Sequence, residues 1–498
     1  MQQDQAWGDV KLTDGAGVMM MGSTEGIPTK PQSATKGADD DDDPMDDDEK
    51  MPVGLVNLGN TCYLNASLQC FRAVPELRQS LKQFSGQFSG WETDQEKSET
   101  VTAAIKSLYD DMDRFPNRMI PLMMVETMRK VYPRFAEQSD HGGFMQHDAN
   151  EAWIELMTNL KKQLLPLSPA ADSGVMPSTA ANFVEQYLEG EFEITMKCKE
   201  SETEPEKHQT DKFQQLNCYL DREIKYLQAG LSSRFKEVVS ANAVTLGRNA
   251  DFDKVMKISR LPAYLTVQMV RFYYKERQAV GAKVLKDVKF PLLLDVFDLC
   301  SPVLQKKLQP YREKFRERDE SAVQRDIAAT RLAKQTNVTV NAPGVTALGS
   351  SQLAEKDAGF IKIDEHEDLE WKDGPVSFPD DSGSSNSGFY ELQAVLTHQG
   401  RTNNSGHYVA WVRRSGDVWL KFDDEKVTPV YTEEVLKLSG GGDWHCAYVL
   451  LYGPRPVPVR VEKATKPSAV LPVGTTKSIT PNNGGGNSSS SHQDMPTD

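Results

Sequence analysis

The chain has 498 residues and a formal net charge of −15, so it can bury a large core and lacks the overall basic surface of a nucleic-acid-binding protein. No apolar run approaches the roughly 20 residues of a membrane-spanning helix. The six cysteines form no CxxC or CxxH pair, so the spacing predicts no cysteine-rich zinc site and no metal cofactor. The polar start has no apolar secretory core, which favours a reducing compartment.

The first 50 residues contain two different kinds of sequence. Residues 1–22 hold two short strand patterns, about Val10–Leu12 and Val18–Met21, around a glycine-containing turn. A single hairpin is not stable alone, so this segment either docks elsewhere or closes a truncated domain. Residues 23–50 are predicted to be a disordered linker, because the nine acidic residues within Asp39–Glu49 repel one another.

A cysteine stands at the predicted start of a helix in the segment Gly54–Cys70 (GLVNLGNTCYLNASLQC). Leucine and phenylalanine recur there at helical spacing, and Asn60 or Thr61 is predicted to cap the helix through its side chain. The positive end of a helix dipole favours a thiolate over a thiol. Cys62 is therefore a candidate nucleophile, although a buried structural cysteine would fit the same stretch.

The chain up to about residue 300 is predicted to be helical first and mixed afterwards. Helices are expected to begin at Pro75, to cover Val101–Met112, and to open at Asp148, where Asp148 and Glu151 fit a capping box. The later predictions are a helix over Lys225–Val239 and strands over Phe192–Cys198, Leu216–Leu220, Ala263–Tyr274 and Val284–Leu294.

Four further strands are predicted near the C-terminus: Tyr390–Thr397, His407–Arg413, Val418–Phe422 and Cys446–Tyr452. The preceding segment, 302–387, is charged and helix-prone to about Leu332. It then carries little periodicity and is predicted to be an inserted, partly mobile segment. The tail 454–498 has no core-forming pattern and is predicted to be disordered.

A cysteine nucleophile needs a nearby base and a group that orients the base. His407 stands at a strand start, and the next strand ends at Asp423. A hairpin turning at Ser415–Asp417 would bring the two side chains together if it contains one bulge or a longer loop. His398 and His445 are rival bases, and Asp424 is a rival acid that alternation places on the opposite face.

An amide donor for an oxyanion is also available five residues before Cys62. The side chain of Asn57 and the Cys62 backbone N–H could together stabilise a negatively charged oxygen. An asparagine before a turn more often forms the turn, and both interpretations remain open from the residues alone.

Several separate motifs resemble those of the ubiquitin-specific protease family. GLVNLGNTCYLNASLQC resembles its cysteine box, QHDANEAW its glutamine–aspartate box, and SGHYVAWVR, WLKFDDEKV and GGGDWHCAYVLLY its histidine box. The resemblance covers about residues 51–453 and implies an α+β, papain-like cysteine protease fold with thumb, palm and fingers. Within the family, SRLPAYLTVQMVRFYYKE and LSGGGDWH resemble the proteasome-associated deubiquitinases, and residues 1–22 resemble the end of their ubiquitin-like domain.

Position by position, the resemblance implies that Cys62 is the nucleophile, His407 the base, Asp423 the orienting acid and Asn57 the oxyanion-hole residue. It also implies that Asp148 holds the ubiquitin tail, a role that must share the carboxylate with helix capping. We further predict that Tyr408, next to the base, binds substrate.

The implied function is thiol-dependent hydrolysis of the bond after the C-terminal glycine of ubiquitin. The expected partners are ubiquitin, its conjugates and the proteasome regulatory particle, bound more weakly if the ubiquitin-like domain is truncated, in the cytoplasm and nucleus. Loops including Gln399–Ser405 and part of 302–387 are expected to cover the cleft and keep basal turnover low. The alternatives are a ubiquitin-binding scaffold with little catalysis, and the same chemistry on another ubiquitin-like modifier.

Overall fold

The computed structural model describes residues 51–116, 118–139, 142–168, 176, 178–275, 280–340, 369–402, 405–442 and 444–462. The chain divides into two units, Met1–Lys50 and Met51–Asp498, and the first lies wholly outside the described residues. The predicted hairpin, ubiquitin-like remnant and acidic linker therefore stay predictions. Among the described residues, no helix is both long and apolar enough to cross a bilayer.

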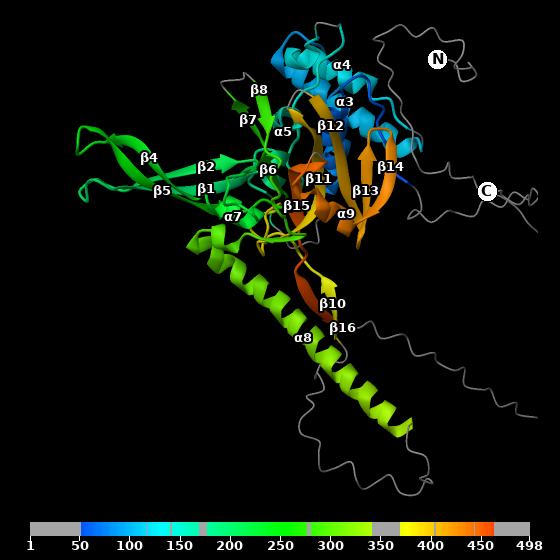
Figure 1. Cartoon of the computed structure of the whole chain (residues 1–498), viewed down its shortest axis with the longest axis vertical. Helices are drawn as coiled ribbons and strands as arrows, with labels where there is room; N and C mark the ends of the chain where they lie inside the picture. Colours follow the sequence, from blue (N-terminus) through cyan, green and yellow to red (C-terminus); the bar gives the residue numbers. More distant parts are fainter. Residues whose placement is uncertain are drawn as a thin grey trace, which may run out of the picture. The chain divides into compact units, whose positions relative to one another are not determined.

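A layer of helices forms the first part of the second unit, in blue to cyan in Figure 1. The predicted helix starts at Cys62, Pro75 and Asp148 are confirmed, whereas α4 was not predicted because its run is short and half of its apolar residues are methionines. The helices are α1 Cys62–Phe71, α2 Pro75–Gln83, α3 Asp94–Arg114, α4 Leu122–Val131, the 3-10 turn Pro133–Ala136, α5 Ala149–Gln163 and α6 Phe183–Tyr187.

The caps of α1 and α5 differ from the predicted ones. Thr61 is the N-cap of α1 but makes no side-chain cap bond, since its hydroxyl accepts the Leu58 N–H at 2.9 Å. The capping prediction for this helix was therefore wrong. Asp148 does cap α5, yet its carboxylate accepts the Asn150 N–H at 2.7 Å, one residue earlier than Glu151 of a capping box.

A ten-stranded sheet packs against the helical layer and is antiparallel except where β3 meets β6. The four predicted C-terminal strands are confirmed as β11, β12, β13 and β15. In spatial order the strands are β14 Lys426–Tyr431, β13 Val418–Asp423, β12 Ser405–Ser415, β11 Phe389–Thr402, β15 Cys446–Pro454, β6 Leu265–Val270 and β3 Leu216–Tyr219, with β7 Phe272–Lys275, β8 Val280–Lys283 and β9 Leu293–Asp295 beside them.

Both faces of this sheet are buried, because neighbouring residues of its central strands enter two different cores. Tyr408 and Ala410 of β12 belong to the core shared with the helices, whereas Val409 and Trp411 belong to the core on the other face. The two cores hold β12 in place from both sides.

Two predictions for the sheet region were wrong. Of Val284–Leu294 only its last two residues are in a strand, because the carbonyls of Val284 and Lys286 accept hydrogen bonds from the buried Arg271 guanidinium instead of a neighbouring strand. The polar segment Gln399–Ser405, expected to be a loop, continues β11 to Thr402, which pairs with Ser405 of β12.

A second sheet of four strands extends from the body at the left of Figure 1, in the order β2-β1-β5-β4. Its strands are β1 Gly190–Cys198, β2 Lys207–Phe213, β4 Lys236–Ala243 and β5 Arg248–Arg260. The helix predicted over Lys225–Val239 is confirmed only as α7, Leu227–Ser232. The rest was wrong because from Lys236 the chain alternates between outward and half-buried side chains and pairs with β5.

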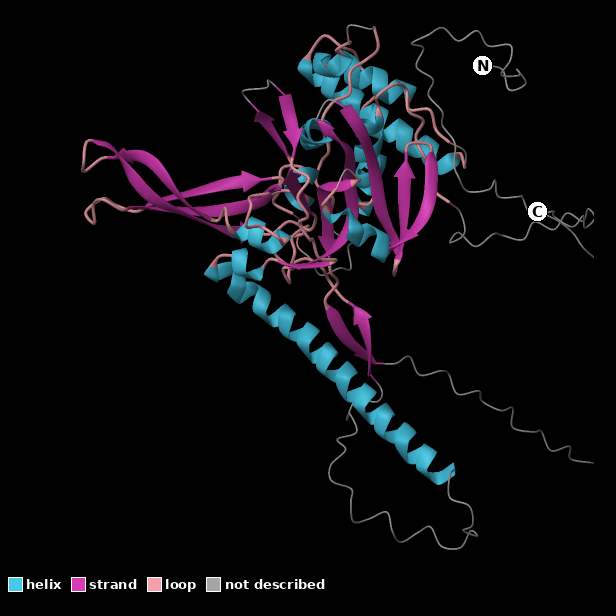
Figure 2. Ribbon diagram, viewed as in Figure 1, coloured by secondary structure: helices cyan, strands magenta, loops and turns pink. Residues whose placement is uncertain are grey.

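The longest helix, α8 Pro302–Val340, confirms the helix-prone start of segment 302–387. Figure 2 shows it as an extended rod next to a two-stranded ribbon, β10 Leu369–Asp373 with β16 Pro458–Glu462. The ribbon shows that the predicted disordered tail begins with a strand. Beyond Glu462, and between Val340 and Leu369, the residues lie outside the described part. The remaining elements are the turn Phe297–Leu299, α9 Thr432–Leu436 and the turn Lys437–Ser439.

The serine-rich stretch after β10 is buried, although it was expected to belong to a mobile segment. Ser384 and Asn386 are 2% and 0% exposed. The Asn386 amide donates to the carbonyls of Pro375 and Ser377 at 2.9 and 3.1 Å. Polar side chains are buried here because their hydrogen bonds are made locally, which a hydropathy pattern does not reveal.

Candidate active site

Cys62 is the first residue of α1 and is 2% exposed. The turn before it is closed by the Asn57 side-chain oxygen, which accepts the N–H groups of Gly59 at 3.0 Å and Thr61 at 3.2 Å. Gly59 and Asn60 both have positive φ angles, as a tight turn at this point requires. The sulfur is thereby held where the helix dipole favours negative charge.

His407 and Asp423 meet as the hairpin prediction requires. His407 Nε2 lies 2.7 Å from Asp423 Oδ1. β12 and β13 pair in antiparallel register with a single irregularity between Arg413 and Ser415, which is the predicted bulge. The other oxygen of Asp423 accepts from Lys421 Nζ at 3.0 Å, so the carboxylate cannot rotate away from the imidazole.

The imidazole of His407 is held in its charged form. The hydrogen bond with Asp423, followed by one with Cys62, raises the pKa of His407 to about 10. His407 in turn lowers the pKa of Asp423 well below its usual range. Because Nε2 bonds the carboxylate, Nδ1 is the nitrogen left for the sulfur. The imidazole is hydrogen-bonded to Asp423, and Cys62 is close enough to contribute to its raised pKa, so the three side chains can exchange one proton.

The rival histidines occupy different environments. Burial lowers the pKa of His398 to about 3 and that of His445 to about 4, so both are neutral near pH 7. The His445 ring centre lies 6.4 Å from that of His407, and its Nδ1 lies 3.3 Å from Thr397 Oγ1. The structure therefore brings His407, and neither rival, to the carboxylate.

The rival acid, Asp424, turns away from His407 and supports the nucleophile loop. Its two oxygens accept the amide N–H groups of Asn57 and Asn65, each at 2.9 Å. Asn57 thus forms the turn with its oxygen and bonds Asp424 with its nitrogen, so the two interpretations of this residue are compatible. Asn57 Nδ2 makes one hydrogen bond to the described residues, the bond to Asp424.

A direct backbone contact links the turn after Asp423 to the extended segment before Cys62. The Leu55 N–H donates to the Asp424 carbonyl at 3.0 Å. A side chain on Gly54 would lie 2.5 Å from the Glu425 carbonyl oxygen, so only glycine allows this approach. Residues 54–55 and 424–425, which are far apart in sequence, are therefore in direct contact, with no other helix or strand between them.

Asp148 is the N-cap of α5, and Tyr408 follows His407 on β12. Both carboxylate oxygens of Asp148 accept from the Tyr448 hydroxyl at 2.7 Å, and burial raises the pKa of Asp148. Tyr408 is 1% exposed, and its ring is tilted by 51° against that of His398, with ring centres 4.6 Å apart. The Tyr408 side chain is thus part of the core in the free protein, and its contact with substrate stays a prediction.

The residue prediction missed Gln146. Its side-chain nitrogen lies 3.5 Å from Cys62 Sγ and 2.9 Å from the Gly406 carbonyl. Gln146 opens the motif QHDANEAW, two residues before the Asp148 that was selected. Its position next to the sulfur could have been found only by treating the whole motif as part of the site.

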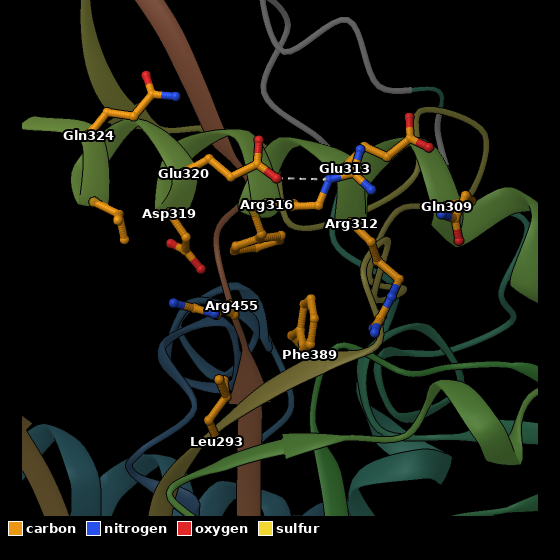
Figure 3. A pocket seen from close by; sticks show the side chains of 12 residues that line it. Leu293, Gln309, Arg312, Glu313, Arg316, Asp319, Glu320, Gln324, Phe389 and Arg455 are labelled. Carbon is orange, nitrogen blue, oxygen red and sulfur yellow. Dashed lines mark ion pairs between the residues drawn. The ribbon is translucent and has the colours of Figure 1, made fainter.

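A cavity of about 790 Å³ lies apart from these residues, between α8 and the sheet edge (Figure 3). Its charged side chains are largely paired, as with Arg316 and Glu320 at 3.5 Å and Arg312 and Asp295 at 2.7 Å. No residue of the Cys62 site lines it, and it has no part in the candidate chemistry.

Comparison with known proteins assigns the family. The family model "Ubiquitin carboxyl-terminal hydrolase" matches residues 53–452. The chain belongs to the ubiquitin carboxyl-terminal hydrolase family. It is 34% identical to ubiquitin carboxyl-terminal hydrolase 6 of Arabidopsis thaliana over 91% of this chain and 89% of that protein. It is likewise 34% identical to ubiquitin carboxyl-terminal hydrolase 14 of Caenorhabditis elegans, over 93% and 87%.

The fold of this hydrolase also matches a solved structure, the SAGA Ubp8/Sgf11/Sus1/Sgf73 DUB module bound to ubiquitin aldehyde. The TM-score is 0.50 at 19% identity, covering 81% of this chain and 70% of that one. The predicted α+β protease fold is confirmed, with the helical layer as thumb, the ten-stranded sheet as palm and the four-stranded sheet as fingers. The chain is a cysteine-type ubiquitinyl hydrolase.

Proposed function

We propose that Cys62, His407 and Asp423 carry out the hydrolysis of the bond that follows the C-terminal glycine of ubiquitin. The supporting observation is the position of His407, which is hydrogen-bonded to Asp423 at 2.7 Å and whose pKa is also raised by Cys62 at the start of α1. This is the arrangement that activates a thiol in cysteine hydrolases, because the nucleophile, the base and the orienting group are in contact.

The reaction proceeds in two steps. The Cys62 thiolate adds to the glycine carbonyl carbon, and the carbonyl π electrons move onto the oxygen. When the carbonyl re-forms, the C–N bond breaks and the His407 imidazolium gives its proton to the leaving amine, which leaves a thioester. His407 then takes a proton from water, whose oxygen displaces the sulfur and releases ubiquitin with a free carboxylate.

Asn57 and the Cys62 backbone N–H are proposed to stabilise the oxygen anion formed in both steps. The bond of 2.9 Å from Asn57 Nδ2 to Asp424 fixes the plane of the amide, so its second N–H keeps one direction. Donors that are already oriented need no reorganisation when the charge develops.

Asp148 is proposed to bind the ubiquitin tail. Its carboxylate is held by the Tyr448 hydroxyl and by the Asn150 N–H. Tyr408 supports this arrangement from the core, since its ring lies 6.2 Å from that of Tyr448.

We further propose that the protein works at the proteasome regulatory particle, in cytoplasm and nucleus, and recycles ubiquitin there. The support is the resemblance of several motifs to the proteasome-associated subgroup. Added proteasome is expected to raise a low basal rate on a ubiquitin reporter. Equal rates with and without proteasome would contradict this partner assignment while leaving the hydrolysis mechanism intact.

The test of the mechanism compares Cys62→Ser and Cys62→Ala with the wild-type chain, using a ubiquitin reporter and a ubiquitin probe with an electrophilic C-terminus. Both variants should lose nearly all hydrolysis and all probe labelling while still binding ubiquitin. Cys70→Ala, a buried cysteine on the same helix, is the matched control and should keep both. Residual hydrolysis in Cys62→Ala would remove Cys62 from the mechanism, and an inactive wild-type chain that binds ubiquitin would favour the scaffold alternative.

A further inference from the structure

Gln146 makes two hydrogen bonds that link three separate parts of the site. Its amide nitrogen donates to Cys62 Sγ at 3.5 Å and to the Gly406 carbonyl at 2.9 Å. Cys62 begins α1, Gly406 precedes the base His407 on β12, and Gln146 lies in the segment before α5. The side chain therefore connects the nucleophile to the strand that carries the base.

The orientation of the Gln146 amide is fixed by the protein. A backbone carbonyl can only accept a hydrogen bond, so the Gly406 oxygen requires the NH₂ group, and not the oxygen, to point toward it. The same NH₂ group then directs its second hydrogen toward the sulfur.

The Gly406 carbonyl is itself rigidly placed. Gly406 has a φ of +136°, which favours glycine, and a side chain there would meet the Gln399 carbonyl and the His398 ring. The next residue, His407, is hydrogen-bonded to Asp423. The acceptor that orients Gln146 therefore keeps a constant position relative to the base.

The segment that carries Gln146 is also anchored. Asn60, in the turn before Cys62, donates its side-chain N–H to the Phe144 carbonyl at 2.8 Å, and the Met145 N–H donates to Glu137 at 2.9 Å. Gln146 is 8% exposed, so water competes little for its bond to the sulfur.

We propose that Gln146 is a positioning residue, which holds the Cys62 sulfur beside His407 in the free enzyme and favours its thiolate by donating a hydrogen bond. A donor stabilises an anionic sulfur more than a neutral thiol, since charge-assisted bonds are the stronger ones. The inference rests on the proposed role of Cys62, and it assigns a function to Gln146 that requires no bound ubiquitin.

The test uses iodoacetamide, which reacts with the thiolate and needs no ubiquitin binding. The alkylation rate of the Cys62 peptide is followed by mass spectrometry from pH 5 to 10 in the full chain. Burial raises the pKa of Cys218 to about 11 and that of Cys300 to about 12, so these thiols react slowly and serve as internal references.

In Gln146→Ala, we expect Cys62 alkylation to be about three- to tenfold slower at pH 6 and to approach the wild-type rate at high pH, because a smaller fraction is thiolate at low pH. Gln146→Glu keeps the side-chain size and replaces the donor by an acid. In this variant, the pH at which Cys62 alkylation reaches half of its maximal rate should be higher than in Gln146→Ala. Gln69→Ala is the matched control: Gln69 is a buried glutamine of α1 that donates to the Val53 carbonyl at 2.9 Å, away from the sulfur.

An alkylation profile of Gln146→Ala that superimposes on that of the wild type would overturn the proposal. So would an equal shift in Gln69→Ala, since that would indicate general loosening of α1. Failure of the nucleophile assignment is recognised separately, because it would appear as hydrolysis by Cys62→Ala whatever the alkylation profiles show.

Discussion

Two helices of this hydrolase, α1 and α8, differ in how much of their surface the protein covers. All ten residues of α1 are buried, whereas α8 has 39 residues and exposes apolar side chains such as Val323, at 57%, and Ile327, at 48%. α1 packs against β12, and α8 lies next to the thin ribbon β10–β16. Cys62, the proposed nucleophile, is on the helix that is packed on every side, which is the environment that holds reacting atoms in fixed positions.

The largest expected effect comes from moving the base relative to α1. In Gly406→Ala the new side chain would meet the Gln399 carbonyl and the His398 ring, so β12 must shift beside His407. We expect kcat/KM on a ubiquitin reporter to fall by at least about 100-fold, since small misplacements of reacting groups have effects of this size. Gly442→Ala is the control, because a side chain there would meet nothing within 4 Å and the backbone is not in the left-handed region. A loss below fivefold in Gly406→Ala would show that β12 tolerates displacement.

The next effect concerns stability and tests the contrast between the helices directly. Leu68 of α1 is 1% exposed, and Leu68→Ala should lower the free energy of unfolding by about 2–5 kcal/mol. Val323→Ala on α8 should change it by no more than about 0.5 kcal/mol. Urea unfolding of both variants measures the difference. Equal losses would mean that α8 is covered in solution by something outside the described residues.

The third effect is on pH dependence. The hydrogen bond from Asp423 is the main cause that raises the pKa of His407 to about 10, so Asp423→Asn should lower that pKa toward its ordinary value of 6.5. His407 must be protonated to give its proton to the leaving amine. The alkaline limb of kcat/KM should therefore move from near pH 10 to lower pH, and the profile from pH 5 to 10 measures it. If the alkaline limb of kcat/KM keeps its position in Asp423→Asn, a group other than His407 titrates in that pH range.

The raised pKa of His407 also makes the stability of the folded protein depend on pH. A raised pKa means that the folded state binds the His407 proton more tightly than the unfolded state. The contribution of His407 to stability is therefore fully present below pH 6.5 and is lost as the pH rises toward 10. In Asp423→Asn the two pKa values become nearly equal, so this pH-dependent contribution should shrink toward zero, which urea unfolding at pH 6 and pH 9 would measure.

The smallest effect is expected in the ribbon next to α8. Arg460 of β16 lies 4.8 Å from the ring of Trp371 on β10. Trp371→Ala should speed amide hydrogen exchange of residues 458–462 by about tenfold, while reporter hydrolysis stays within about twofold of the wild type. A large loss of hydrolysis would show that the ribbon is coupled to the active site, and would contradict the difference between α8 and α1.

The sequence was most informative where few residues separate the groups concerned. His407 and Asp423 belong to one hairpin, so strand alternation and a single bulge predicted their contact. The start of α1 at Cys62 followed in the same way from local helical spacing. Short-range patterns of this kind determine the structure because the intervening chain has few alternative arrangements.

The features that were missed depend on contacts between distant segments. Gln146 reaches Cys62 across 84 positions, and Thr61 does not cap α1 because its hydroxyl bonds within the preceding turn instead. The buried Asn386 is polar, and only the backbone carbonyls around it reveal why it is inside. Propensity and hydropathy describe single positions and carry no information about such partners.

The close approach of Gly54 to Glu425 has a consequence for how the family can vary. The turn that follows Asp423 is fixed directly to the segment before Cys62, by the hydrogen bond from the Leu55 N–H to the Asp424 carbonyl and by the close approach of Gly54 to Glu425. The four-stranded fingers and α8 lie between Cys62 and His407 in sequence, away from this attachment. A longer loop within the fingers or after α8 would therefore leave the attachment in place, since each doubling of loop length costs only about 0.6 kcal/mol.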